Sequence, residues 1–181
     1  TGELRRSFGA FGSGPDQLRA PRALAVHEGL VYVADSCNHR IQVFNIADGT
    51  HVRSIGRSHP SYVYVYDDIL WELDPDDPRV GTRPGEFNEP AGVAIGHGRL
   101  YVSEDAGRRL QVLTLDGEPL MTPIPSPDPV PDENNTYYPN GPSGVCVDGD
   151  NIWLVGARGV LVGPAEATRD TFRVHLFTAV G

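Results

Sequence analysis

The sequence predicts an all-β protein that repeats one four-stranded antiparallel unit about three times. When the chain is aligned on Pro21, Pro90 and Pro142, each proline precedes a short apolar strand, and a second strand begins ten residues after it. The chain also contains 21 glycines and 16 prolines among 181 residues, a composition that favours many turns over long helices. Both observations indicate short strands joined by tight turns.

Residues 30–44 are the clearest copy of the second and third strands. The strands are rich in β-branched residues, and the polar residues 35–39 between them supply turn chemistry. Residues 100–113 repeat this pattern in the second copy. In both copies an arginine, Arg40 or Arg109, opens the third strand nineteen residues after the alignment proline.

The segment that leads into the first strand, called the approach segment below, is repeated as well. Residues 12–21 parallel residues 81–90, with Leu18 and Phe87 at the same position. Agreement at several points with fixed spacing indicates a true internal repeat.

A turn and a fourth strand complete the unit. The Asp-Gly turn at 48–49 leads into a strand over 51–56, and the turn recurs at 116–117. Because the chain opens on a similar turn and strand, residues 1–9 are predicted to be the outer strand of a preceding unit. The third copy is degenerate: its turn shortens to 157–159, residues 160–162 replace the third strand, and residues 171–177 are the predicted outer strand.

Four short antiparallel strands at a period of about 40–50 residues are typical of the blade of a β-propeller. One blade cannot bury both of its faces alone, so neighbouring blades cover each other. Closed propellers need at least about four blades, so these residues are expected to belong to a longer chain, or to pair with a second copy or another partner. The predicted organisation is residues 1–9 as the outer strand of a preceding blade, 10–56 as a blade, 57–80 as an insertion, 81–121 as a blade, 122–135 as a proline-rich strap and 136–181 as a degenerate blade.

Residues 35–44, with the strands that lead into them, resemble the NHL repeat, the Asn-His-Leu family of propeller blades. Asn38 and His39 match the motif, and Arg40 stands in place of the leucine. The resemblance implies a segment of a larger, six-bladed propeller. It also implies a non-catalytic protein-interaction or scaffold module within a larger protein or complex, including ubiquitin-ligase-type architectures.

The two insertions carry most of the negative charge. Residues 57–89 contain 3 arginines and 8 acidic residues, and residues 122–141 contain 3 acidic residues and no arginine. Within the first insertion, residues 62–66 alternate tyrosine and valine, and an extended strand would place the three tyrosines on one face. Alternate prolines from 123 to 131 favour an extended strap. An acidic, aromatic-rich extension favours docking to a basic protein surface; a solvated loop over the propeller edge is the other interpretation.

The residues predicted to bind a partner belong to the turns and to the first insertion. They are Asn38, His39, Arg108 and Arg158, which are expected to be exposed in the turns, and Tyr62, Tyr64, Tyr66 and Trp71 in the insertion. The carboxylate–arginine pairs that bracket the turns recur in successive blades, which favours a structural role over a catalytic one. These pairs are Asp35 with Arg40 and Glu104 with Arg109.

Two other functions stay open. Metal-dependent propeller enzymes of the peptide-amidating-lyase and lactonase types resemble NHL blades in fold, but the spacing assigns no catalytic residue, metal ligand or cofactor here. Of the six histidines, His27 and His97 follow the first strands and could meet across blades, without the spacing of a zinc site. Some NHL propellers bind RNA, although the net charge of −9 argues against nucleic acid as a partner. An RNA-binding patch would draw on Arg22, Arg40, Arg108, Arg109 and Arg158.

The composition also bears on the compartment. No apolar run approaches the roughly 18–20 residues of a membrane helix, so no membrane insertion is expected. The two cysteines, Cys37 and Cys146, fall at different points of the repeat and are too few for a disulfide framework. This pattern favours a reducing, intracellular compartment.

Overall fold

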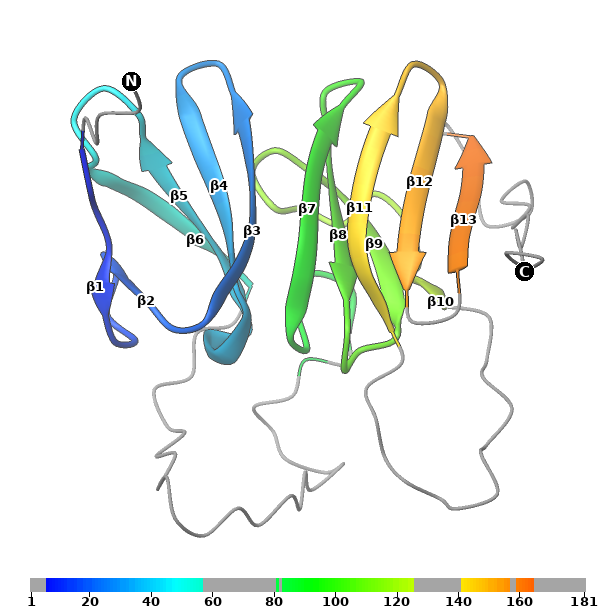
Figure 1. Cartoon of the computed structure of the whole chain (residues 1–181), viewed down its shortest axis with the longest axis horizontal. Helices are drawn as coiled ribbons and strands as arrows, with labels where there is room; N and C mark the ends of the chain where they lie inside the picture. The colour runs from blue at the N-terminus through cyan, green and yellow to red at the C-terminus, as the bar shows by residue number, and fades with distance from the viewer. Residues whose placement is uncertain (1–5, 57–80, 82, 126–140, 157–158, 165–181) are drawn as a thin grey trace, which may run out of the picture.

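The computed structural model describes residues 6–56, 81, 83–125, 141–156 and 159–164. Three antiparallel sheets of four, four and three strands stand side by side in chain order, and a separate two-stranded pair precedes them (Figure 1). The only helical element in the described ranges is one short 3₁₀ turn. The all-β propeller class predicted from the repeat is therefore confirmed, and the three sheets are called blades 1, 2 and 3 below.

Blade 1 runs in chain order from its first strand to its fourth. It consists of β3 (Pro21–His27), β4 (Leu30–Asp35), β5 (Arg40–Asn45) and β6 (His51–Ile55). Each strand pairs antiparallel with the next, and the 3₁₀ turn η1 (Ser36–Asn38) joins β4 to β5. Two short parallel strands, β1 (Ala10–Phe11) and β2 (Gln17–Leu18), form the approach to the blade.

Blades 2 and 3 repeat this order. Blade 2 consists of β7 (Pro90–Gly96), β8 (Arg99–Glu104), β9 (Arg109–Thr114) and β10 (Ile124–Pro125). The short β10 pairs with the start of β9 and lies within the segment that the sequence assigned to the proline-rich strap. Blade 3 consists of β11 (Pro142–Asp148), β12 (Asn151–Gly156) and β13 (Gly159–Pro164).

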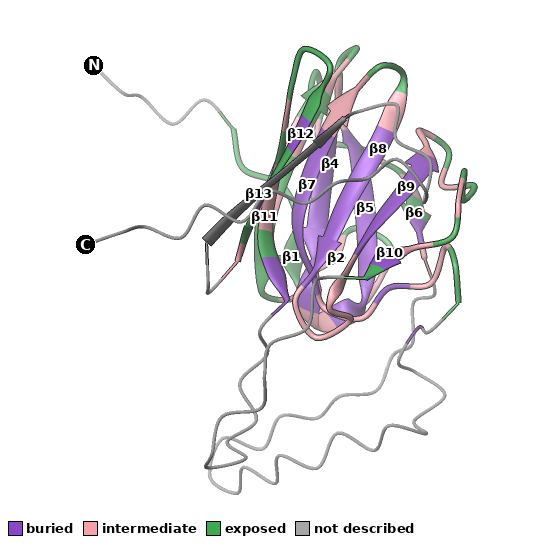
Figure 2. Ribbon diagram, turned by 90° about the vertical axis from the view of Figure 1, so that its right-hand side faces the viewer, coloured by how far each residue is buried: buried purple, intermediate pink, exposed green. Residues whose placement is uncertain are grey.

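The blades pack face to face, with their first strands β3, β7 and β11 side by side. Tyr32 of β4 lies in a buried cluster with Val93 and Val102 of blade 2. Tyr101, at the matching position of β8, lies in a second cluster with Ile152 and Leu154 of blade 3. Buried residues therefore concentrate between the blades, along β4, β5, β7, β8 and β9 (Figure 2).

Ser103 of β8 is a buried polar residue whose hydroxyl oxygen has no hydrogen-bond partner. The matching position of blade 1 is Ala34, which is equally buried. An unpaired buried hydroxyl costs about 1–3 kcal/mol. Replacing Ser103 by alanine should therefore raise the free energy of unfolding by about 1 kcal/mol in a urea titration. The reverse change, Ala34→Ser, should lower it; a destabilised S103A protein would show that the hydroxyl is satisfied.

No helix in the described residues is long and apolar enough to cross a membrane.

Candidate functional site

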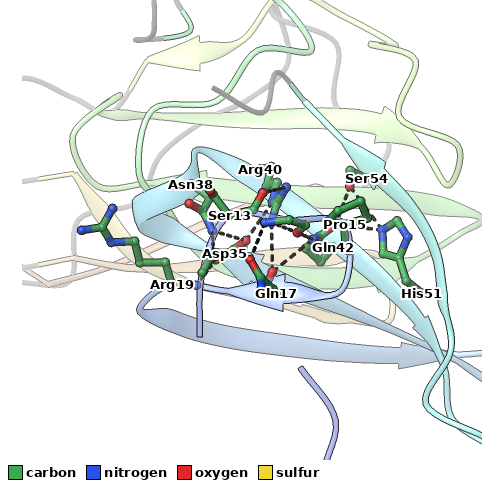
Figure 3. A network of polar contacts seen from close by, with 12 residues as sticks. Ser13, Pro15, Gln17, Arg19, Asp35, Asn38, Arg40, Gln42, His51 and Ser54 are labelled. Carbon is green, nitrogen blue, oxygen red and sulfur yellow. Dashed lines mark hydrogen bonds and ion pairs between the residues drawn. The ribbon is translucent and has the colours of Figure 1, made fainter. Parts of the chain in front are cut away.

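Asp35, at the end of β4, is the centre of a buried polar network (Figure 3). Its carboxylate accepts hydrogen bonds from the Arg19 backbone N–H at 2.6 Å, the Asn38 side chain at 2.8 Å and Arg40 Nε at 2.8 Å. The terminal nitrogens of the same guanidinium group, Nη1 and Nη2, donate to backbone carbonyls of the approach segment, namely those of Ser13, Gly14 and Gln17. The turn and the approach segment are therefore held together by one ion pair.

Gln42, two residues after Arg40, extends this network to the outer strand of the blade. Its Nε2 donates to the carbonyl of Pro15 at 2.8 Å, and its Oε1 accepts from the hydroxyl of Ser54 at 2.5 Å. The ring of His51 lies 3.0 Å from the same Oε1. Gln42 thus joins the segment before the blade to the outer strand β6.

Blade 2 contains the same arrangement. Arg109 Nε donates to Glu104 at 2.9 Å, and Glu104 also accepts from the Asn88 backbone N–H at 2.9 Å. Arg109 reaches the approach segment through the carbonyls of Gly81 and Glu86. Burial raises the pKa of Glu104, and the neighbouring Arg109 opposes that shift. The pair recurs in two blades with matching partners. This indicates a structural role, in which the pair holds the turn of each blade to the segment that precedes the blade.

Asn38 and His39 do not have the exposure that the sequence predicted, and that expectation is wrong. They are only 3% and 6% exposed. Asn38 donates to Asp35 and to the carbonyl of Gly12, and His39 Nδ1 accepts the backbone N–H of Glu89 in blade 2. Both side chains are covered because the approach segment and blade 2 close over the turn. Arg108, in the matching turn of blade 2, is partly exposed with φ 49°.

A charged cluster that the sequence did not single out lies where blades 1 and 2 meet. Arg22 of β3 contacts Asp105 at 2.8 Å and Glu89 at 3.8 Å. Glu89 stands directly before the alignment proline of β7, and its φ of 49° is shared by Ala20 at the matching position of blade 1. Arg22 and Glu89 occupy repeat positions next to the prolines, so the repeat alignment was the signal that could have brought them together.

The surroundings of Glu89 shift its pKa. Burial raises its pKa above the ordinary 4.5; Arg22 lowers it and Asp105 raises it further. The native state therefore keeps the carboxyl proton of Glu89 to a higher pH than the unfolded chain does. As a result, the contribution of Glu89 to stability falls as the pH rises from about 4.5 through the raised pKa.

The variant Glu89→Gln should remove this part of the pH dependence. Relative to the native protein, its free energy of unfolding should increase between pH 4 and pH 8, measured by urea titration across that range. Glu118→Gln, an exposed glutamate outside the cluster, is the control. A stability difference for E89Q that is constant across the range would show that Glu89 titrates alike in the native and unfolded states.

Both insertions attach at the same end of the blades as the β4–β5 and β8–β9 turns. Gly56, which precedes the first insertion, lies against Phe87, and a Cβ added there would lie 3.3 Å from the carbonyl oxygen of His39. Gly141, which follows the second, lies against the carbonyls of Glu104 and Asp105. The charged cluster and both attachment points therefore share one face, called the turn face below.

Several predicted site residues fall outside the described residues: Arg158, Tyr62, Tyr64, Tyr66 and Trp71. Of the two histidines considered for a metal, His27 lies 3.8 Å from Glu28, and His97 contacts the carbonyl of Gly149 in blade 3 at 2.6 Å. The described residues contain no group of three or more His, Cys, Asp or Glu side chains placed to hold a metal ion. Cys37 and Cys146 do not form a disulfide.

Comparison with known families gives one match, which falls on the blade 1 network. The family model described as NHL repeat covers residues 18–44, from the end of β2 through most of β5. Residues 18–44 match the NHL repeat. The matched residues therefore include the Asp35–Arg40 pair and the covered turn between them. Other members of the network in Figure 3 lie outside the match, namely Ser13, Pro15, Gln17, His51 and Ser54.

Solved structures similar to this chain are propellers. They include the U3-55K protein (15% identity, TM-score 0.59, 93% of this chain and 42% of that chain) and the virginiamycin B lyase of Staphylococcus aureus (16%, 0.57, 93% and 43%). The hydrazine synthase of Kuenenia stuttgartiensis is also similar (10%, 0.56, 98% and 40%). No curated protein matched the sequence. At this identity the likeness concerns the fold, and the chain spans about two fifths of each of these proteins.

Proposed function

We propose that this chain is a non-catalytic protein-interaction module of a larger protein or complex, and that its turn face binds the partner. The observation that carries the proposal is the shared attachment of both acidic insertions at the turn face, beside the Arg22–Glu89–Asp105 cluster. Separate acidic segments that leave one face concentrate negative potential there. A partner with a basic surface would match that potential.

The buried networks support this choice over catalysis. The carboxylates of Asp35 and Glu104 are both fully buried, and each is hydrogen-bonded to the arginine and the backbone of its own blade. Carboxylates that are buried and hydrogen-bonded in this way stabilise the blade and are not accessible to a substrate. Further blades, from a longer chain or from another subunit, would cover the open sides of the propeller segment.

The binding face can be tested with a labelled arginine-rich peptide of about 15 residues. The full chain should bind it at about 50 mM salt, and binding should weaken at least about tenfold at 300 mM salt because the attraction is electrostatic. Changing Asp128, Asp132 and Glu133 of the second insertion to Asn and Gln should weaken binding. The matched control neutralises Glu28, Asp48 and Asp116, three exposed acids in turns at the opposite end of the blades, and should leave binding unchanged.

Other outcomes of these experiments would favour a different function. Equal weakening by the two sets of changes would mean that only net charge matters, and the turn face would lose its role. Salt-sensitive binding of mixed single-stranded RNA oligomers, lost in an Arg22→Ala variant, would favour the RNA-binding alternative. Stoichiometric zinc or calcium in the purified protein would favour the metal-dependent enzyme.

A further inference from the structure

His39 joins blade 1 to blade 2 at the turn face through a hydrogen bond that depends on its protonation state. The residue is buried, and its Nδ1 lies 3.1 Å from the backbone nitrogen of Glu89, just before the first strand of blade 2. A backbone N–H can only donate, so Nδ1 must offer a lone pair. The bond therefore requires a neutral imidazole that carries its proton on Nε2.

The backbone of the β4–β5 turn fixes the ring in this place. His39 ends η1 in the left-handed region, with φ 52° and ψ 42°, and its backbone N–H donates to the carbonyl of Ser36 at 3.0 Å. On the same turn, the Ser36 hydroxyl donates to the carbonyl of Pro90 at 2.5 Å. Two side-chain hydrogen bonds thus join this turn to the start of β7, and one of them comes from a side chain that titrates between pH 5 and 8.

A proton on Nδ1 would break the bond between His39 and Glu89. An imidazolium has two N–H donors and no acceptor, so it would place one donor against another. The closed contact would then hold a buried charge and an unpaired backbone N–H, both of which are costly. An open contact does not have this cost, because water solvates the ring. Acid therefore favours the open contact.

The charged groups around His39 do little to offset this effect. Among the described residues, the elements that surround it carry Arg22, Asp35, Arg40, Glu86, Glu89 and Asp105. Each aspartate is already paired with one of the two arginines, and Glu86 accepts the backbone N–H of Arg83 at 3.4 Å. Burial raises the pKa of Glu89, so its negative charge decreases as the pH falls. These groups therefore add little stabilisation for a charged His39.

His97 provides an internal contrast, because it also joins two blades. Its Nε2 lies 2.6 Å from the carbonyl oxygen of Gly149 in blade 3, and a carbonyl oxygen can only accept. The neutral and the protonated imidazole can both donate that bond. At the position that matches His39, blade 2 has Arg108. A proton therefore opposes the His39 contact and not the His97 contact.

We propose that the contact between blades 1 and 2 is pH-sensitive: protonation of His39 at mildly acidic pH breaks its hydrogen bond to Glu89 and opens the turn-face end of this contact. The inner part of the contact stays closed, because it consists of apolar side chains such as Ile41, Val93 and Val102. This inference does not depend on which partner binds the turn face, and its test uses no peptide.

Hydrogen exchange of the full chain measures the opening at a single amide. The protection factor of the Glu89 amide, which corrects for the intrinsic pH dependence of exchange, should fall at least about tenfold from about pH 7.5 to about pH 5.5. The amide of Val102, in the middle of β8, should keep its protection over the same range. The ¹⁵N chemical shifts of the His39 ring at the higher pH should place the proton on Nε2.

Two substitutions separate the hydrogen bond from the backbone conformation, because Asn and Gly both tolerate the left-handed region. His39→Asn keeps an acceptor that does not titrate, so the fall in Glu89 protection should disappear. His39→Gly removes the acceptor, so protection should be low at both pH values. His97→Asn is the matched control, since His97 has φ 51°, and it should leave the fall unchanged. Circular dichroism checks that each variant is folded.

Any of four results would overturn the proposal. Equal protection of the Glu89 amide at both pH values would mean that the contact stays closed in acid. A fall that persists in H39N would assign the acid sensitivity to another group. High protection in H39G would mean that the amide has another acceptor. Parallel falls at Glu89 and Val102 would mean that acid unfolds the blades together.

Discussion

Replacing Arg40 by alanine is expected to lower the free energy of unfolding by about 3–5 kcal/mol, the usual cost of breaking a buried ion pair by removing one partner. Arg40 is 2% exposed and Asp35 is fully buried, so the carboxylate that remains cannot recover its hydration. Three backbone carbonyls of the approach segment lose the hydrogen bond from Arg40 in the same change. Guanidinium titrations of the two proteins measure the difference.

Arg109→Ala is the matched variant, because the same pair recurs in blade 2. Its cost should be smaller at low pH and should grow as the pH rises, since the pKa of Glu104 is already raised by burial and Arg109 opposes that shift. Without Arg109, Glu104 can take up a proton instead of remaining an unpaired charge. If R40A changed the stability by less than about 1 kcal/mol, the network would be replaceable by water.

The variant Phe87→Ala is expected to destabilise the protein by about 3–5 kcal/mol, the range for truncating a buried phenylalanine. Phe87 is 1% exposed and lies between blade 1 and blade 2, against Gly56 and within the cluster that contains Tyr32 and Leu113. Its removal leaves a cavity in the contact between blades, which neither sheet can fill alone. Thermal and urea unfolding should both report the loss.

Leu18 provides the comparison for Phe87, because it holds the same position in the approach to blade 1. It is only partly buried, against Val31, Val33 and Phe44, so Leu18→Ala should cost less than F87A in the isolated chain. Equal losses in the two variants would mean that the side of blade 1 is already covered in solution. The same pair of variants therefore reports on whether blade 1 has a neighbour.

The repeat made much of the fold predictable from the sequence. Alignment on three prolines placed the first and second strands of each blade, and it also matched Leu18 with Phe87. Strand periodicity and Asp-Gly turns are local signals, which is why they could be read from one chain. The two-residue β10 carries too little local pattern to be recognised, and it is defined only by its pairing with β9.

The candidate site was less predictable, because its contacts join distant parts of the chain. The polar turn 35–39 has the composition of an exposed turn, but the approach segment and the backbone of Glu89 cover it. A sequence gives the chemistry of a turn and not what closes over it. The contact of Glu89 with Arg22 escaped notice for the same reason, since the two residues meet only when blades 1 and 2 pack.

The fixed ends of the first insertion make it a suitable position at which to insert a foreign segment. Gly56 is held by Phe87 in front of the insertion, and Gly81 behind it is held by Arg109 through a 2.8 Å hydrogen bond. The length between two fixed ends has little effect on stability, because doubling a loop costs only about 0.6 kcal/mol. Foreign segments such as an epitope, a fluorescent reporter or a second binding peptide should therefore be accepted there, so that blades 1 and 2 serve as a display platform.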